Sequence, residues 1–143
     1  MGESSTSTDN TFLNWIFGGM SYENDRVPAS LTKVTVSKGS SIGGSAFDSC
    51  NNIMTIILPS TITSVGNYAF YNCTALKYVY YSEVLDPTEG EIYLPSVVTS
   101  IGEGAFEGCS KLTSINIPSK VKTIGNNAFK ESGLASLTFE EIR

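Results

Sequence analysis

The sequence of 143 residues contains no histidine and few charged residues. Without histidine, the chain lacks the Ser-His and Cys-His nucleophile pairs, the usual zinc sites and the side chain best suited to proton transfer near neutral pH. Charged residues make up 16% of the chain, and 9 Lys and Arg against 14 Asp and Glu give a net charge of −5. Because this charge repels phosphate backbones and no basic stretch offsets it, we expect no nucleic-acid partner.

Long apolar runs are also missing. The longest is far shorter than the ~20 residues that span a bilayer, and residues 1–10 are polar rather than basic and then apolar. We therefore expect no membrane insertion and an export signal that is absent from this chain. Small hydroxyl side chains are abundant instead, with 20 Ser and 14 Thr. Because neutral hydroxyls outnumber charges, we predict an extracellular or cell-surface localisation.

The chain repeats a short pattern centred on the dipeptide Ala-Phe. An aliphatic residue followed by glycine begins five residues before each Phe, and a cysteine or serine lies three residues after it. The four copies, with spacings of 23, 36 and 23 residues, are Ala46-Phe47 with Cys50, Ala69-Phe70 with Cys73, Ala105-Phe106 with Cys109, and Ala128-Phe129 with Ser132. Self-similarity at a fixed period indicates a solenoid or a repeat array.

A strand frame of the form L-x-x-I-x-I precedes each copy and opens a fifth unit. The five frames are Leu31/Val34/Val36, Ile53/Ile56/Leu58, Leu76/Val79/Tyr81, Leu112/Ile115/Ile117 and Leu134/Leu137/Phe139. Three units then carry a proline, at Pro59, Pro95 and Pro118, which suits the end of a strand because proline lacks an N–H. One such unit cannot bury its own apolar face, so we expect the units to stack as parallel coils around a continuous core.

The combined pattern L-x-x-I-x-I-P-x-x-V-x-x-I-G-x-x-A-F-x-x-C resembles the leucine-rich repeat of the BspA type. The match is best over residues 112–129 and extends over residues 31–139. The resemblance implies a β-rich leucine-rich-repeat solenoid, a right-handed coil or horseshoe of parallel strands with repeats of about 23 residues. It also implies a bacterial cell-surface protein that adheres to host proteins and cells, and it implies no catalytic residue.

The repeat pattern predicts where the regions of the chain begin and end. We expect a disordered start and an N-terminal cap over residues 1–30, then four full repeats and a partial fifth over residues 31–143. The apolar cluster at residues 12–17 would cover the exposed edge of the first coil. The extra residues 82–94 contain a Pro and a Gly at spacings that favour a projecting hairpin. Their acids lack the spacing of a calcium loop, which leaves a solvated hairpin or a protein-contact element.

The three cysteines share one repeat position and should line up inside the coil. A disulfide needs Cβ atoms about 3.8 Å apart, which is closer than the strand spacing of about 4.8 Å. The chain also has no C-x-x-C pair to add to its lack of histidine. We therefore predict free, buried thiols that act as small apolar residues, no metal site and no cofactor.

The outward positions of the strand frames are the candidate binding residues. Side by side they form a strip of hydroxyls and amides with an apolar and aromatic centre. The candidates are Met54, Ile57, Lys77, Tyr78, Tyr80, Ser114 and Asn116. Exposed aromatic rings beside small hydrogen-bonding groups suit a glycan or a protein hot spot. The alternative is an ordinary strand surface, because β-propensity alone favours Thr, Tyr and Ile there.

These observations predict an extracellular or cell-surface recognition module that is not an enzyme. It would adhere to a host extracellular protein or a glycan through the exposed sheet face. The alternative is a structural spacer, one segment of the stalk of a larger surface protein with no ligand of its own. The sequence leaves the identity of the ligand and the oligomeric state open.

Overall fold

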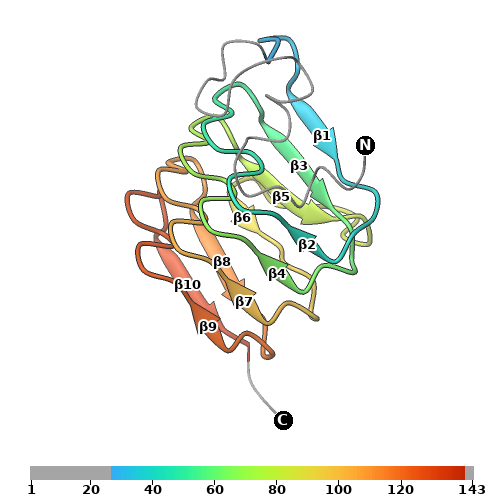
Figure 1. Cartoon of the computed structure of the whole chain (residues 1–143), viewed down its shortest axis with the longest axis vertical. Coiled ribbons are helices and arrows are strands. Elements are labelled where there is room, and N and C mark those ends of the chain that lie inside the picture. Colours follow the sequence, from blue (N-terminus) through green and yellow to red (C-terminus); the bar gives the residue numbers. More distant parts are fainter. Residues whose placement is uncertain (1–26, 141–143) are drawn as a thin grey trace.

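Short strands alternate between two parallel sheets in the computed structural model, which describes residues 27–140 (Figure 1). Sheet A has the strand order β1 (Lys33–Thr35), β3 (Thr55–Leu58), β5 (Tyr78–Tyr81), β6 (Glu91–Ile92), β8 (Ser114–Ile117), β10 (Ser136–Phe139). Sheet B has the order β2 (Ser41–Ile42), β4 (Ser64–Val65), β7 (Ser100–Ile101), β9 (Thr123–Ile124). The described residues form no helix, and hence none that could cross a membrane. The predicted parallel-strand solenoid is confirmed.

The strand frames place their aliphatic residues inside the coil. In the second frame Ile53, Ile56 and Leu58 are fully buried. Parallel pairing aligns like positions of neighbouring coils, as in Ile56 opposite Val79, so each frame position forms an inward ladder of similar side chains. Strands β3 and β8 end directly before Pro59 and Pro118, where a residue without an N–H can no longer extend the ladder of hydrogen bonds.

The Ala-Phe turns form a second ladder along the coil. The phenylalanine rings of successive coils lie stacked, with centroids 5.6 Å apart for Phe47 and Phe70, 5.1 Å for Phe70 and Phe106, and 5.6 Å for Phe106 and Phe129. The first three rings are buried. Phe70 and Phe106 are direct neighbours although the extra residues of the third repeat lie between them in sequence, so these residues add nothing to the spacing on this side of the coil.

The extra residues do not form the predicted hairpin. They supply strand β6, which pairs in parallel with β5 through Val79 and Ile92 and with β8 through Ile92 and Ile115. Sheet A therefore has six strands, one more than the five frames predicted. Sheet B has no counterpart for this strand, because β4 pairs directly with β7. The sheet accepts the segment because Ile92 and Leu94 supply the last two inward positions of a frame, and both are buried.

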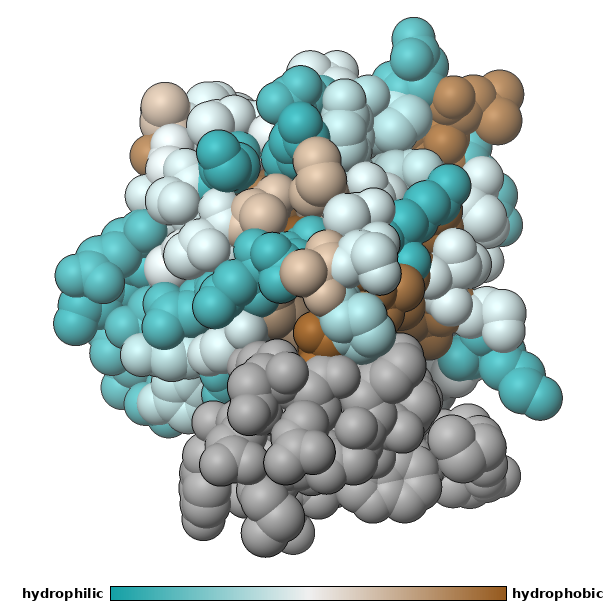
Figure 2. Space-filling model, turned by 90° about the horizontal axis from the view of Figure 1, so that it is seen from above, coloured by the Kyte–Doolittle hydropathy of each residue, from teal (hydrophilic) through white to brown (hydrophobic). Residues whose placement is uncertain are grey.

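The two ends of the coil differ in what the structure describes. The predicted N-terminal cap falls mainly on residues 1–26, which lie outside the described residues. Figure 2 looks at this end and shows apolar atoms in the middle of the face with hydrophilic ones around them. At the other end the ladder residues of the last coil are open, with Leu137 41% and Phe139 70% exposed. These two residues are open because no further strand pairs with the far side of β10 in the described part of the chain.

Candidate functional site

The outer face of sheet A brings the predicted binding residues together. The parallel register aligns Thr55 with Tyr78, Ile57 with Tyr80, and Glu91 with Ser114. The pairing of Val79 with Ile92 then places Tyr78 beside Glu91 and Tyr80 beside Tyr93. The face carries two rows of side chains about 4.8 Å apart from strand to strand. One row is Lys33, Thr55, Tyr78, Glu91, Ser114 and Ser136, and the other is Thr35, Ile57, Tyr80, Tyr93, Asn116 and Thr138.

The seven predicted residues all lie on or beside this face. Ile57, Tyr78, Tyr80 and Ser114 are half-buried in the strands, and Asn116 is exposed. The remaining two, Met54 and Lys77, are half-buried in the turns directly before β3 and β5. Lys77 Nζ lies 3.8 Å from Glu89 Oε2, an ion pair open to solvent and therefore weak. The strip that the frames predicted is thus continuous in space.

Two members of the strip, Glu91 and Tyr93, were not among the predicted binding residues, because strand β6 itself was not predicted. The Tyr93 hydroxyl accepts a hydrogen bond from the Thr88 backbone N–H at 3.0 Å and donates one to Glu91 Oε1 at 3.2 Å. These two hydrogen bonds, one accepted and one donated by the hydroxyl, hold the Tyr93 ring in place. The sequence signal for this strand is Ile92-x-Leu94-Pro95, which repeats the end of the frame at residues 115–118 without its leading leucine.

The connection from β5 to β6, residues 82–90, lies against the outer face of sheet A. Because the two strands are parallel, the chain must return from the carboxyl end of β5 to the amino end of β6. The inner side is filled by the core, and the Thr88 N–H reaches the hydroxyl of Tyr93, which is on the outer side. Leu85 of this return loop is 93% exposed. The predicted projecting hairpin is thus replaced by a loop that borders the tyrosines of the strip.

A small cavity of about 230 Å³ opens where β6 and β8 end. It is lined on the strip side by Glu91, Tyr93 and Asn116, and on the far side by Ser96 and Glu140. The Glu140 carboxylate is held there, since its Oε1 accepts a hydrogen bond from the Ser119 N–H at 2.9 Å. Asn116 is the one predicted site residue that lines this cavity. The cavity offers carboxylate, amide and hydroxyl groups beside an aromatic ring, which suits hydrogen bonding to a ligand at the edge of the strip.

The three cysteines are free and buried, as predicted. Their thiols also donate hydrogen bonds to the preceding coil, from Cys73 Sγ to the Phe47 carbonyl and from Cys109 Sγ to the Phe70 carbonyl, each at 3.0 Å. Burial raises the pKa of Cys50 and of Cys109 to about 12 and that of Cys73 well above its ordinary value. These thiols stay protonated near neutral pH and are therefore poor nucleophiles. Within residues 27–140, no group of three or more cysteines and carboxylates is placed to hold a metal ion.

Comparisons with known proteins match this geometry. The family model described as "BspA type Leucine rich repeat region (6 copies)" matches residues 26–90 and 88–143. A leucine-rich repeat protein from Bacteroides ovatus is 31% identical with a TM-score of 0.58, and the match covers 78% of this chain and 27% of that one. The leucine-rich repeat protein of T. pallidum is 25% identical with a TM-score of 0.55, covering 78% of this chain and 59% of that one. No curated protein matches the chain.

Proposed function

The chain belongs to the BspA-type leucine-rich repeat family, and on that premise we propose that it is a cell-surface recognition module that adheres to a host protein or glycan. The family is one of surface and protein-interaction repeats. The chain spans 27% and 59% of the two solved structures described above, so the activity of a whole protein of this kind belongs to the proposal as well. Binding is assigned to the outer face of sheet A.

The observation that supports this proposal is the row Ile57, Tyr80 and Tyr93 on three adjacent strands. Large apolar and aromatic side chains at neighbouring outward positions give a contact area that loses little conformational entropy on binding. The strands beneath them are fixed by parallel pairing, and the Tyr93 ring is fixed further by its hydroxyl. Anchors of this kind, surrounded by smaller polar groups such as Ser114 and Asn116, are typical of interface hot spots.

The shape of the face favours a protein over a small ligand. The two rows cross six strands, and the cavity at their edge holds only about 230 Å³. A drug-sized ligand prefers a concave site of about 300–1,000 Å³. A partner with an extended surface can contact Ile57, Tyr80 and Tyr93 together, and its polar groups can meet Asn116 and Glu91. A glycan would contact fewer of these groups at once.

A structural spacer is the second candidate. It is favoured by the regular stacking of the coils and by the small share of the B. ovatus protein that this chain covers. A segment of a long coil can keep a distant binding domain away from the cell without a ligand of its own. In a spacer the tyrosines would reflect β-propensity alone, so only the binding candidate predicts that their removal abolishes an interaction.

The test is binding of the purified chain to an array of extracellular-matrix proteins and mucosal glycans. The variant Tyr78→Ala with Tyr80→Ala is measured beside it, with Tyr71→Ala as a control because Tyr71 is a half-buried tyrosine on a turn outside sheet A. We expect at least one signal that falls tenfold or more in the double variant and persists in the control, with similar thermal midpoints. An array without any signal would favour the spacer, and a signal that persists in the double variant would exclude this face.

A further inference from the structure

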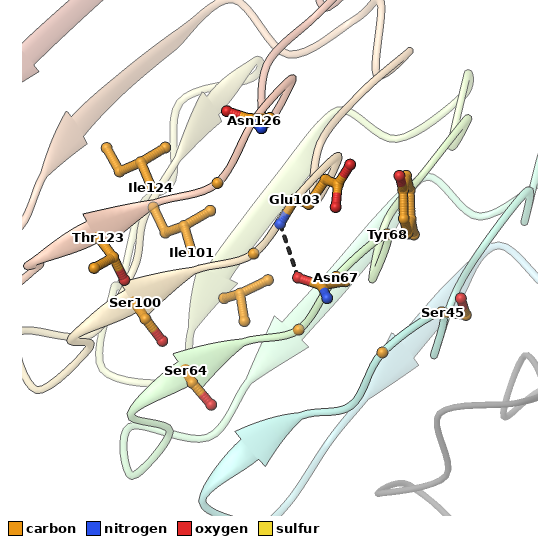
Figure 3. A pocket seen from close by; sticks show the side chains of 15 residues that line it. Ser45, Ser64, Asn67, Tyr68, Ser100, Ile101, Glu103, Thr123, Ile124 and Asn126 are labelled. Atoms are coloured by element: carbon orange, nitrogen blue, oxygen red, sulfur yellow. Dashed lines mark hydrogen bonds between the residues drawn. The ribbon is translucent and has the colours of Figure 1, made fainter.

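A groove of about 840 Å³ crosses sheet B and the corner that follows it, away from the strip on sheet A (Figure 3). One side carries the outward hydroxyls of Ser64, Ser100 and Thr123, which the register of β4, β7 and β9 places in a line. The other side carries Asn67, Glu103 and Asn126 from the next turn of each coil. Figure 3 shows these two rows and the ring of Tyr68 beside the second row, near Glu103.

Glycines form the floor between the two rows, and no larger residue could replace them. A Cβ on Gly66 would lie 2.6 Å from the Gly44 nitrogen, and a Cβ on Gly102 would lie 2.6 Å from the Asn67 nitrogen. Real Cβ atoms do not approach backbone that closely, so the coils need glycine at this corner. Because the packing of the coils admits no side chain at these glycines, no side chain fills the space between the two rows and the groove stays open.

The extra strand on sheet A places sheet B on the inner side of a bend. Between the coils of β3 and β6, sheet A holds two strand spacings, or about 9.6 Å, because β5 lies between them. On sheet B the same coils are joined by a single spacing from β4 to β7, and the Phe70 and Phe106 rings are 5.1 Å apart. Because sheet A is longer than sheet B along the solenoid axis, the solenoid bends toward sheet B. The groove therefore lies on the concave side of this bend.

The groove excludes two common kinds of ligand. Its lining has no lysine or arginine and one carboxylate, Glu103, so it gives a phosphate, sulfate or carboxylate ligand no counter-charge. It also offers no free strand edge to an extended peptide. The N–H groups of Gly66, Gly102 and Gly125 are already bonded at 2.8 Å to carbonyls of the preceding coil. A ligand therefore meets side-chain hydroxyls, amides, one carboxylate and one aromatic ring.

Tyr68 gives the groove a rigid aromatic surface. Its ring lies over Gly104 of the next coil, where an added Cβ would come within 2.6 Å of Tyr68 Cδ1. Its pKa is raised, chiefly by the interaction of its hydroxyl with the Glu103 carboxylate and then by desolvation and nearby acidic groups. Gly104 thus covers one side of the ring. The Tyr71 ring also packs against it at right angles, with centroids 5.6 Å apart, and the part of the ring that stays exposed can stack on a ligand, since Tyr68 is only half-buried.

We propose that this groove binds a neutral, linear oligosaccharide. A sugar ring presents an apolar C–H face that stacks on an aromatic ring and hydroxyls that pair with amides, carboxylates and other hydroxyls. A hydroxyl and an amide or carboxylate recur on each of the coils of β4, β7 and β9 about every 4.8 Å, so a ligand that runs along the coil meets repeated polar partners. The site lies on sheet B, so the inference is independent of binding by sheet A.

The test is calorimetric titration of the purified chain with neutral hexasaccharides of cellulose, mannan, xylan and starch, with a heparin hexasaccharide as the anionic comparison. The first variant is Tyr68→Asn, which removes the ring but keeps the backbone, because Asn127 holds the same left-handed conformation in the last coil, with φ 62° against 57° for Tyr68. The second is Glu103→Ala. A third variant, Tyr80→Ala, reports sugar binding by sheet A, and the control is Lys120→Ala, an exposed residue on the turn after β8 outside both faces. We expect one or more neutral sugars to bind, at least tenfold weaker binding by both groove variants, and no change in the control.

A second measurement keeps the proposal testable if a variant folds poorly. Backbone NMR spectra of the unaltered chain with the same sugars should show the largest shifts at Gly66, Gly102 and Gly125. The proposal fails if no neutral hexasaccharide binds at millimolar concentration, if the heparin fragment binds more tightly than all of them, or if binding survives Tyr68→Asn. A sugar signal lost in Tyr80→Ala alone would belong to sheet A and would also overturn it.

Discussion

Phe70 stacks on Phe106 with ring centroids 5.1 Å apart, although the two residues are separated by the longest interval between Ala-Phe pairs in the chain. Both rings are fully buried. Their contact shows that the extra residues of the third repeat enter sheet A alone and leave the Ala-Phe side of the coil at its ordinary spacing.

The phenylalanine ladder should contribute strongly to stability. We expect Phe70→Ala and Phe106→Ala each to lower the free energy of unfolding by about 3–5 kcal/mol, because each leaves a cavity between two stacked rings. Urea unfolding followed by circular dichroism measures this. Phe139→Ala is the matched control, since Phe139 is 70% exposed, and its cost should stay within about 0.5 kcal/mol. Equal costs for buried and exposed phenylalanines would contradict the assigned packing.

Strand β6 can be tested against the hairpin that the sequence predicted. Ile92 is 2% exposed in the core, so Ile92→Ala should cost about 2–5 kcal/mol in unfolding free energy. Leu85 lies in the return loop at 93% exposure, and Leu85→Ala should change stability by less than about 0.5 kcal/mol. A projecting hairpin would make both substitutions nearly neutral. A small effect of Ile92→Ala in urea unfolding would therefore favour the hairpin over strand β6.

Most of the fold follows from the sequence because ladder positions repeat the same residue type on every coil. The frames at Ile53 and Leu112 predicted the buried positions and the strand ends, and the Ala-Phe pairs predicted the stacked rings. Strand β6 was missed because Glu89 stands where the other frames begin with leucine or isoleucine, so that only its last two inward positions match. A search for the complete frame cannot recover a strand that keeps two of its three positions.

The candidate sites were predictable to different degrees. Outward positions follow from inward ones, so Tyr78 and Tyr80 could be placed on one face, whereas Tyr93 depended on recognising β6. The groove on sheet B had no sequence signal of its own. Its serines, glycines and asparagines are common in turns, and its shape depends on close backbone packing and on an extra strand on the opposite sheet. Such effects arise only when the coils are stacked.

The corner glycines should tolerate no side chain. A Cβ on Gly102 would lie 2.6 Å from the carbonyl carbon of Gly66 as well as from the Asn67 nitrogen, so Gly102→Ala must push two coils apart. We expect a loss of about 1–3 kcal/mol, as for other overpacked positions. The control is Ser100→Ala, two residues earlier, where the side chain points out of sheet B and the change should stay within about 0.5 kcal/mol. If Gly102→Ala unfolds at the same urea concentration as the unaltered chain, the close coil packing is wrong.

The buried thiols predict how stability changes at alkaline pH. Burial raises the pKa of Cys50 and Cys109 to about 12, whereas an unfolded thiol ionises near pH ~8.5. Above that pH the unfolded state releases protons that the folded state retains, so the free energy of unfolding should be constant below pH ~8 and fall steadily as the pH rises toward 12.

Urea unfolding of the reduced chain at pH 7 and pH 10 measures this fall, and a variant with all three cysteines replaced by alanine should show a smaller one. Labelling with a thiol reagent at pH 8 adds an independent check, since buried, protonated thiols should react no faster than the chain opens. Cys73 is the most deeply buried and accordingly should react last. Rapid labelling of the folded chain, or an equal pH dependence in the alanine variant, would show that the thiols are accessible.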